Sequence, residues 1–216
     1  MVREFTLNEI WTILAAVQAT LVLSAIAFTG GGVFGLLVAL MRTAPVRWMR
    51  TVAAGFIDFF QGTPMLLQLF LVFYGLPVFG WHVNVWVAAA VGLTLHAAAF
   101  LGEIWRGGIQ AVPAGQAEAA SALGLRYADR MRYVVLPQAL RMSFAPTVGF
   151  LVQLIKGTSL AAIIGFIELS RAAQLVSSTT YKPLWAYGCA AVGYFLICFP
   201  LSRFAARLER RYAAAS

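Results

Sequence analysis

Five long apolar stretches alternate with shorter polar segments along the chain, and this pattern predicts helices that cross a lipid bilayer. The stretches cover about 11–41, 59–79, 85–105, 144–167 and 184–201. About 20 consecutive apolar residues are enough to cross the hydrocarbon core, so the first stretch is long enough to tilt or to extend beyond the membrane. We therefore expect an all-α integral membrane protein with five transmembrane helices, in a single domain that occupies residues 1–216.

Glycines gather in the second half of the first stretch, where Gly31 and Gly35 form a small-xxx-small pattern. In lipid, this pattern lets a neighbouring helix approach closely. We expect this face of the first helix to pack against another helix; the alternative interpretation is a hinge at the glycines.

The basic residues are distributed unevenly between the two sides of the predicted helices. Of the sixteen Lys and Arg residues, twelve fall in the segments after the first, third and fifth stretches, and three fall on the opposite side: Arg3, Arg171 and Lys182. Cytoplasmic loops carry the excess of positive charge in membrane proteins. The bias predicts an N-terminus outside the cell and a C-terminus in the cytoplasm.

Composition agrees with a membrane protein and excludes a soluble globule. Hydrophobic residues make up 61% of the chain and charged residues only 11%, which is too little charge to cover a soluble surface. The net charge of +8 does not indicate nucleic-acid binding, because the basic residues flank apolar stretches instead of forming a patch with exposed aromatic residues.

The longest polar interruption is a basic segment whose centre is Glu118–Pro137, on the predicted cytoplasmic side. Helix-forming residues lead to Gly124, which readily adopts the left-handed conformation that ends a helix. A second basic helical segment follows, and Pro137 favours a break or kink at its end. We expect a short helix from about 115 to 123, a sharp turn at Gly124–Leu125, and a second helix that returns to the membrane.

This segment resembles the cytoplasmic EAA loop of ABC-importer permeases. The shared features are Glu-Ala-Ala at 118–120, Gly124 four residues later, and Leu136-Pro137 at the end; Val134 replaces the isoleucine usual in that family. Nearly the whole chain resembles the polar amino-acid branch of this family. The segments that carry the resemblance begin at Gln61, Glu103, Leu136, Lys156 and Glu168. Two departures are Gln61 in place of an arginine and Gly157 in place of a common aspartate.

The resemblance implies a type I importer permease fold, with an EAA coupling loop at about 106–141, in the bacterial plasma (inner) membrane. It also implies four kinds of partner: a second permease subunit, identical or similar; two ATP-binding subunits, which carry Mg-ATP; an external or periplasmic substrate-binding protein; and the lipid bilayer. The residues expected to couple the permease to the ATPase are Glu118, Ala119, Ala120, Gly124, Leu125, Arg126, Leu136 and Pro137. For Glu118, the alternative is that it only caps its own helix.

The chain is expected to bind no nucleotide, cofactor or metal of its own. It lacks a Gly-x-x-x-x-Gly-Lys-Ser/Thr loop. Polar residues near the middle of the apolar stretches are the candidates for the substrate path, because such groups are costly in a membrane unless they are used. These candidates are Gln68, His96, Lys156, Thr158 and Ser159. Snorkelling or a carbonyl partner is the alternative for Lys156, and ordinary packing is the alternative for His96.

Three further expectations concern charges and other functions. Asp58 and Glu103, near the cytoplasmic face, are expected to form structural ion pairs with Arg106 or Arg50. A membrane enzyme would need a reactive constellation, and with two histidines on different elements we identify no catalytic residue. An ATP-independent channel is a third alternative, but it would leave the EAA-like loop without a role.

Overall fold

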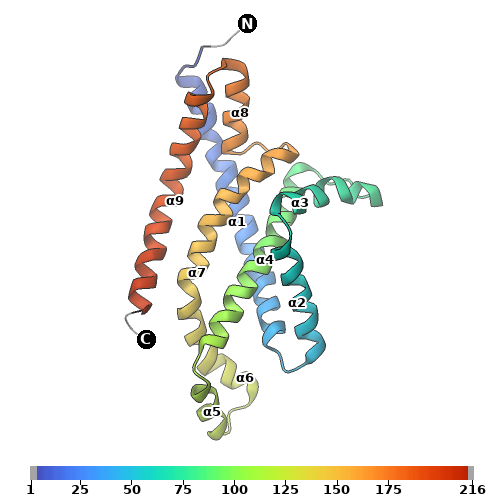
Figure 1. Cartoon of the computed structure of the whole chain (residues 1–216), viewed down its shortest axis with the longest axis vertical. Coiled ribbons are helices and arrows are strands. Elements are labelled where there is room, and N and C mark those ends of the chain that lie inside the picture. The colour runs from blue at the N-terminus through green and yellow to red at the C-terminus, as the bar shows by residue number, and fades with distance from the viewer. Residues whose placement is uncertain (1–3, 214–216) are drawn as a thin grey trace.

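The computed structural model describes residues 4–213, and all regular structure in that range is helical. Four long helices run along the long axis of an elongated bundle (Figure 1): α1 (Leu7–Thr43), α4 (Val85–Ala111), α7 (Leu136–Gly157) and α9 (Pro183–Ala213). Segments 7–43, 85–111, 127–164 and 183–210 are long and apolar enough to cross a membrane. The predicted all-α membrane architecture is confirmed, and all four segments are longer than the predicted stretches.

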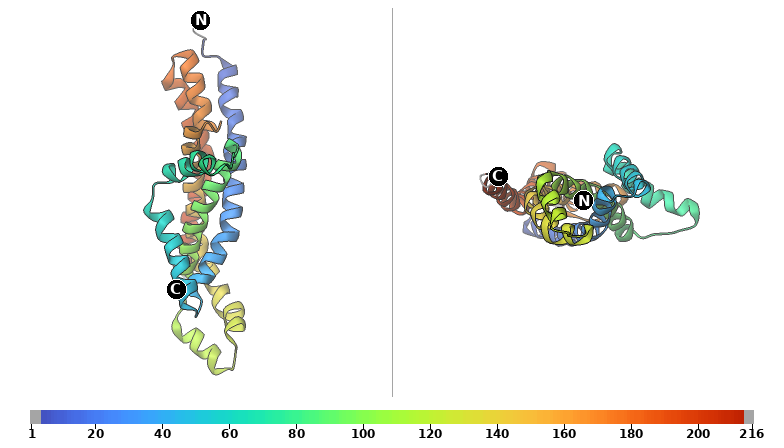
Figure 2. Two further views of the ribbon diagram at one scale, coloured as in Figure 1. Left: turned by 90° about the vertical axis from the view of Figure 1, so that its right-hand side faces the viewer. Right: turned by 90° about the horizontal axis from the view of Figure 1, so that it is seen from below.

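The second predicted span, 59–79, is not one straight helix but part of a bent pair of helical segments. Helix α2 (Arg47–Gly62) ends before Thr63–Pro64, and the chain bends by 105° into α3 (Met65–Phe70), η1 (Leu71–Gly75) and η2 (Leu76–Phe79). Proline disfavours helical geometry in the preceding residue, and Thr63 is extended with φ −117° and ψ 143°. The chain therefore has five candidate spans only if this bent pair counts as one. The segment after the bend projects sideways from the bundle (Figure 2).

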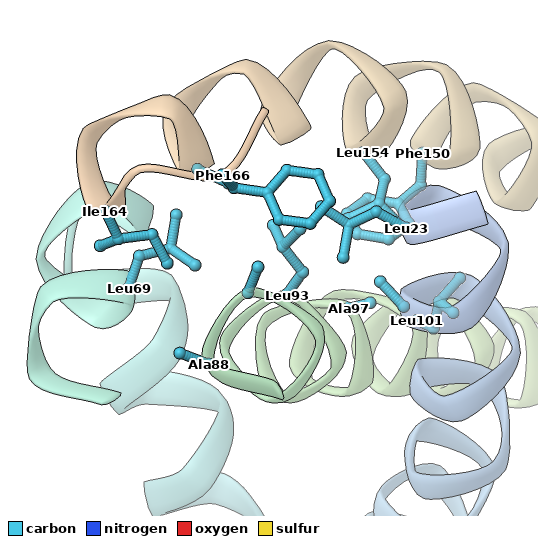
Figure 3. Close-up of a cluster of buried hydrophobic side chains, with 13 residues drawn as sticks. Leu23, Leu69, Ala88, Leu93, Ala97, Leu101, Phe150, Leu154, Ile164 and Phe166 are labelled. Atoms are coloured by element: carbon cyan, nitrogen blue, oxygen red, sulfur yellow. The ribbon is translucent and has the colours of Figure 1, made fainter. Parts of the chain in front are cut away.

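Helices α1 and α4 pack closely because small residues face each other. A Cβ atom on Gly31 would lie 2.4 Å from the Cβ of Ala97, and one on Gly35 would lie 3.0 Å from the carbonyl oxygen of Ala98. The predicted packing face on α1 is thus confirmed. Figure 3 shows the adjoining core, in which Leu23, Leu93 and Phe166 come from α1, α4 and the segment after α7.

Helix α7 continues an uninterrupted helical rod that begins in the polar segment. α6 (Tyr127–Arg130) leads through a π-helical turn, η3 (Met131–Val135), directly into α7. The expected break at Pro137 is absent: this proline lies in the first turn of α7, directly after the π-helical turn. A proline within a helix removes one backbone hydrogen bond, and here it does so where the bonding pattern already changes from π to α. At its other end α7 tightens into the 3₁₀ segment η4 (Thr158–Ile164), which ends at Gly165 with φ +88°.

The mixed-charge connection between the last two predicted spans is a helix, α8 (Leu169–Thr180), which lies beside the upper parts of α1 and α9 (Figure 1). Hydropathy does not predict this helix, because its last turn consists of the polar residues Ser177–Thr180. Glu168 forms the N-cap, because its carboxylate accepts hydrogen bonds from the backbone N–H groups of Ser170 and Arg171.

The basic segments gather at one end of the bundle. The lower part of Figure 1 contains the α1–α2 connection, the polar segment between α4 and α7, and the end of α9. This agrees with the orientation predicted from charge, with that end in the cytoplasm. Arg3, which the charge count assigned to the outer side, lies outside the described residues, and the side chain of Arg211 is not described either.

Candidate functional site

The coupling elbow, which we define as residues 114–135, projects from the lower end of the bundle between α4 and α7 (Figures 1 and 2). Its first helix is α5 (Ala114–Ala122), close to the predicted 115–123. Gly124 follows with φ +77°, the left-handed geometry expected of it. The N–H of Leu125 donates to the carbonyl of Ala120 at 3.1 Å, and the N–H of Gly124 donates to that of Ser121 at 3.0 Å. These two bonds define a Schellman motif, which closes the helix and fixes the direction of the turn.

Side chains hold the two short helices of the elbow to each other and to α1. The Arg130 guanidinium donates a hydrogen bond to the Ser121 hydroxyl and lies 5.5 Å from the centre of the Tyr127 ring, a cation–π distance. The Tyr127 hydroxyl lies 3.4 Å from the carbonyl oxygen of Thr43 at the end of α1. The elbow is therefore a fixed structure instead of a loose loop.

The two faces of the elbow differ in exposure. Its inner face is closed by a small apolar cluster in which Val112, Val135 and Ala139 are buried. Glu118 and Ala119 are exposed, whereas Ala120 is only 4% exposed and is covered by the chain itself. The most exposed apolar side chain of the elbow was not predicted: Leu123, at its tip, is 82% exposed.

The remaining expected coupling residues lie along the way from the tip to the bundle. Arg126 is exposed and forms the N-cap of α6, and Leu125 before it is partly buried. Leu136 is partly buried and Pro137 exposed in the first turn of α7. These residues therefore lie at two places, directly after the Schellman turn and at the start of α7, and do not form one patch.

Of the five expected substrate-path residues, Gln68 and His96 are brought together. The Gln68 amide nitrogen donates to the carbonyls of Phe60 and Thr63 at 2.8 and 3.0 Å, and its carbonyl oxygen lies 3.0 Å from His96 Nδ1. Because that oxygen only accepts, Nδ1 carries the proton. Gln68 is 3% exposed, and its amide satisfies the α2 carbonyls that the bend leaves free. The pair therefore joins the α2–α3 bend to α4.

Lys156 and Ser159 line an open cavity of about 560 Å³ between the end of α7 and α9. Ser170 and Tyr194 contribute further hydroxyl groups to its wall. Thr158 does not line the cavity: it is fully buried, its hydroxyl donates to the carbonyl of Ile155 at 2.7 Å, and its side chain also contacts the Tyr194 hydroxyl. Of the expected residues, Lys156 and Ser159 line one cavity, although the Ser159 hydroxyl also donates to the carbonyl of Lys156 at 2.7 Å. The other three are buried or partly buried in internal hydrogen bonds.

Glu168 is a buried acid that the sequence placed in an external connection. It is 0% exposed, and the Tyr194 hydroxyl donates to its carboxylate at 2.6 Å. Two backbone N–H groups, of Ser170 and Arg171, also donate to this carboxylate, at 2.9 and 2.7 Å. A buried carboxylate needs such partners, and because glutamate is not a preferred N-cap residue, the sequence did not signal this role.

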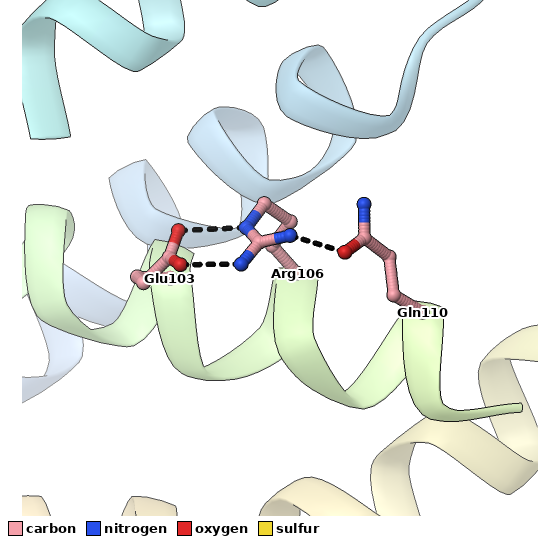
Figure 4. Close-up of polar contacts among 3 residues, drawn as sticks. All are labelled: Glu103, Arg106 and Gln110. Atoms are coloured by element: carbon pink, nitrogen blue, oxygen red, sulfur yellow. Dashed lines mark hydrogen bonds and ion pairs between the residues drawn. The ribbon is translucent and has the colours of Figure 1, made fainter.

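One of the two expected ion pairs is present (Figure 4). Arg106 Nε donates to Glu103 at 2.7 Å, and the same guanidinium contacts Gln110. This is an i, i+3 pair within α4, as expected for a structural role. Asp58 is exposed and makes no ion pair among the described residues, so that expectation is wrong.

Comparisons with known proteins identify the family. The profile of the family described as "Binding-protein-dependent transport system inner membrane component" matches residues 31–214. The chain is 35% identical to the "Probable amino-acid ABC transporter permease protein YckA" of Bacillus subtilis, over 93% of this chain and 89% of that protein. It is 36% identical to the "L-cystine transport system permease protein TcyB" of the same organism, over 94% and 88%.

Solved structures agree. A chain of the "amino acid ABC transporter with histidines" superposes with a TM-score of 0.86, at 34% identity over 93% of this chain and 94% of that chain. A chain of the "MetNI methionine ABC transporter" in an inward-facing conformation has the same fold, with a TM-score of 0.74 at 21% identity over 94% and 99%. The chain therefore belongs to the inner-membrane permeases of binding-protein-dependent (ABC) importers, in the amino-acid branch of that family.

Proposed function

We propose that this chain is the permease subunit of an ATP-driven importer for polar amino acids. A separate ATPase would supply the energy, and substrate would cross by alternating access between two permease subunits. Several similar proteins are named as amino-acid, glutamine or cystine permeases, which supports this substrate class.

The observation that carries the proposal is the coupling elbow. It is held to the bundle by its own apolar cluster and by the bond from Tyr127 to α1, and it presents Leu123 at its tip. An exposed leucine on a fixed turn at the basic end of the bundle fits a groove on a partner protein. We propose that this partner is the ATPase, and that Leu123, Glu118, Ala119 and Arg126 contact it, while Ala120 and Gly124 maintain the shape of the elbow.

The complete importer would contain two ATP-binding subunits that carry Mg-ATP, two permease subunits and an external or periplasmic binding protein, in the bacterial inner membrane. The chain itself would be a transport subunit and not an enzyme. Its elbow lies at the end of the bundle where basic residues gather, which is the side from which a cytoplasmic ATPase would bind.

For the substrate path we propose the cavity lined by Lys156 and Ser159. Lys156 is exposed at the end of α7, inside a candidate membrane span, and makes no ion pair among the described residues. An unpaired ammonium group is costly at this depth unless it is used. It is therefore suited to bind the carboxylate of an amino acid. Gln68 and His96 would support the path indirectly, through the α2–α3 bend.

The test is uptake into proteoliposomes that contain the permease, its ATPase and its binding protein. We expect labelled amino acid to accumulate only with hydrolysable ATP. The variant Leu123→Asp should lose about tenfold or more in both uptake and stimulated ATP hydrolysis, because a carboxylate placed in a partner's apolar groove loses its hydration without gaining a partner.

The matched control is Leu7→Asp, the same change at a similarly exposed leucine, 76% exposed, at the start of α1. Because α1 is 37 residues long, its ends extend beyond a hydrocarbon core of about 30 Å. This control should transport normally. Uptake without ATP, or full activity of Leu123→Asp, would contradict the proposal.

A further inference from the structure

Two cavities lie on either side of the short 3₁₀ segment η4, and they share one residue. The first, of about 560 Å³, is lined by Lys156 and Tyr194 among others; the second, of about 440 Å³, lies between α3, η4 and α8 and is lined by Arg171, Gln174 and Tyr74. Ser159 lines both. The two cavities therefore adjoin at Ser159, and we refer to them together as one region.

Each cavity has one positively charged side chain on its wall, and neither has an acidic one among the described residues. Lys156 makes no ion pair within the described part of the chain. The Arg171 guanidinium donates to a neutral acceptor, the Gln174 amide oxygen, at 2.7 Å. Both cations thus retain hydrogen-bonding capacity for a ligand, and a ligand in this region experiences a positive potential.

The one acid close to the region in sequence does not compensate these charges at the cavity surface. Glu168 precedes Arg171 by three residues, but its carboxylate bonds to the backbone N–H of Arg171 and not to the guanidinium. It is fully buried and also accepts from the Tyr194 hydroxyl. A carboxylate occupied in this way is not available to bind the cationic side chain of a substrate.

No side chain projects from the position that follows Lys156. Residue 157 is glycine, and a Cβ atom built there would lie 2.5 Å from Cε of Met65. The space into which a side chain at position 157 would project is therefore already filled by a methionine from α3. This packing leaves the region without an anionic group that could bind a substrate's cationic side chain.

We propose that this region selects an amino acid with a carboxylate side chain. Lys156 binds the α-carboxylate, Arg171 binds the side-chain carboxylate through its planar fork of donors, and Ser159 lies between the two cavities. Amino acids with a cationic side chain are excluded by like-charge repulsion. This inference rests on the proposed function and makes Arg171 a specificity-determining residue of the same site.

The test is direct binding of labelled glutamate, glutamine and arginine to the purified permease–ATPase complex in detergent, without the binding protein, whose own selectivity would otherwise enter. We expect glutamate to bind at least about tenfold more tightly than arginine. Arg171→Gln should weaken glutamate binding about tenfold or more and leave glutamine binding within about twofold, because only glutamate has the charge that Arg171 recognises.

Two further variants keep the result interpretable. Arg171→Lys retains the charge and should restore part of the glutamate affinity, which a purely structural role for Arg171 would not predict. The control Lys182→Gln removes an exposed cation that lines neither cavity and should bind all three amino acids as the unaltered protein does. Gel filtration of each complex tests whether it assembles. If Arg171→Gln does not assemble, Lys156→Gln takes its place, and this variant should weaken the binding of both glutamate and glutamine.

The outcomes separate this inference from the proposed function. Arginine binding as tightly as glutamate, or unchanged glutamate affinity in Arg171→Gln, would overturn the charge assignment and leave an amino-acid importer in place. If no amino acid binds, the substrate assignment fails; if ATP-driven uptake is also absent, the proposed function fails with it.

Discussion

Replacing Gly124 by alanine should weaken coupling without preventing membrane insertion. Gly124 has φ +77°, and a Cβ atom built on it meets no heavy atom within 4 Å. The cost of the substitution is therefore conformational and not a clash. An L-residue in the left-handed region costs about 1–2 kcal/mol.

This cost acts on the elbow and not on the bundle. The Schellman bonds from Gly124 and Leu125 back to α5 exist only while residue 124 stays left-handed. A loss of about 1–2 kcal/mol changes a local equilibrium by a factor of about 5–30. We expect the intact elbow to open that much more often, and the ATPase to hydrolyse ATP with less uptake per nucleotide. A β-branched replacement such as Gly124→Val should have a larger effect, because its side chain tolerates this region less.

Gly115→Ala is the matched control, because it is the same substitution in the same elbow with the opposite expectation. Gly115 lies in the first turn of α5, also with nothing within 4 Å of a built Cβ, but its φ is not positive. Alanine there should cost nothing and stabilise the helix by up to about 1 kcal/mol. Uptake per ATP in proteoliposomes, together with amide hydrogen exchange at residues 123–125, measures both effects. Equal coupling and equal exchange in the two variants would refute the reasoning.

Two predictions concern the bundle itself. Gly31→Ala should lower the free energy of unfolding by about 1–3 kcal/mol, because the new methyl group would lie 2.4 Å from the Cβ of Ala97. The control Gly149→Ala, where a built Cβ meets no atom within 4 Å, should not lower it. Equal melting temperatures for the two variants would disprove the close packing. Trp105→Phe removes the 3.0 Å bond from the indole N–H to the Thr147 hydroxyl and should cost about 1 kcal/mol; an unchanged melting temperature in detergent would show that this link between α4 and α7 contributes nothing.

Much of the fold could be predicted because a bilayer requires long apolar helices. The four unbroken spans, the glycine face of α1 and the turn at Gly124 all follow from local chemistry that the sequence displays. Hydropathy alone did not predict the bend at Thr63–Pro64, because apolar residues lie on both sides of the short Gln61–Pro64 interruption and an averaged hydropathy carries no information about direction. Gln68 compensates for the bend, because its amide donates to backbone carbonyls that would otherwise lack a partner in the membrane. The farthest of these carbonyls, that of Phe60, is eight positions away in the sequence.

The candidate site was predictable only in part. Residue types and spacing identified the elbow, but not which face of α5 is covered, and so not that Ala120 is buried and Leu123 exposed. Midplane position alone grouped Gln68, His96 and Thr158 with Lys156, although the first three are in internal hydrogen bonds. The Gln68–His96 contact joins residues 28 positions apart, and a linear pattern does not contain such a contact.

The π-helical turn at Met131–Val135 has a geometric consequence for the whole machine. It contains one residue more than an α-helical turn would need, directly between the elbow and α7. If that residue were returned to α-helical geometry, everything before it would rotate by about 100° and advance by about 1.5 Å relative to α7. The direction in which the elbow points relative to α7 is therefore set by this one extra residue.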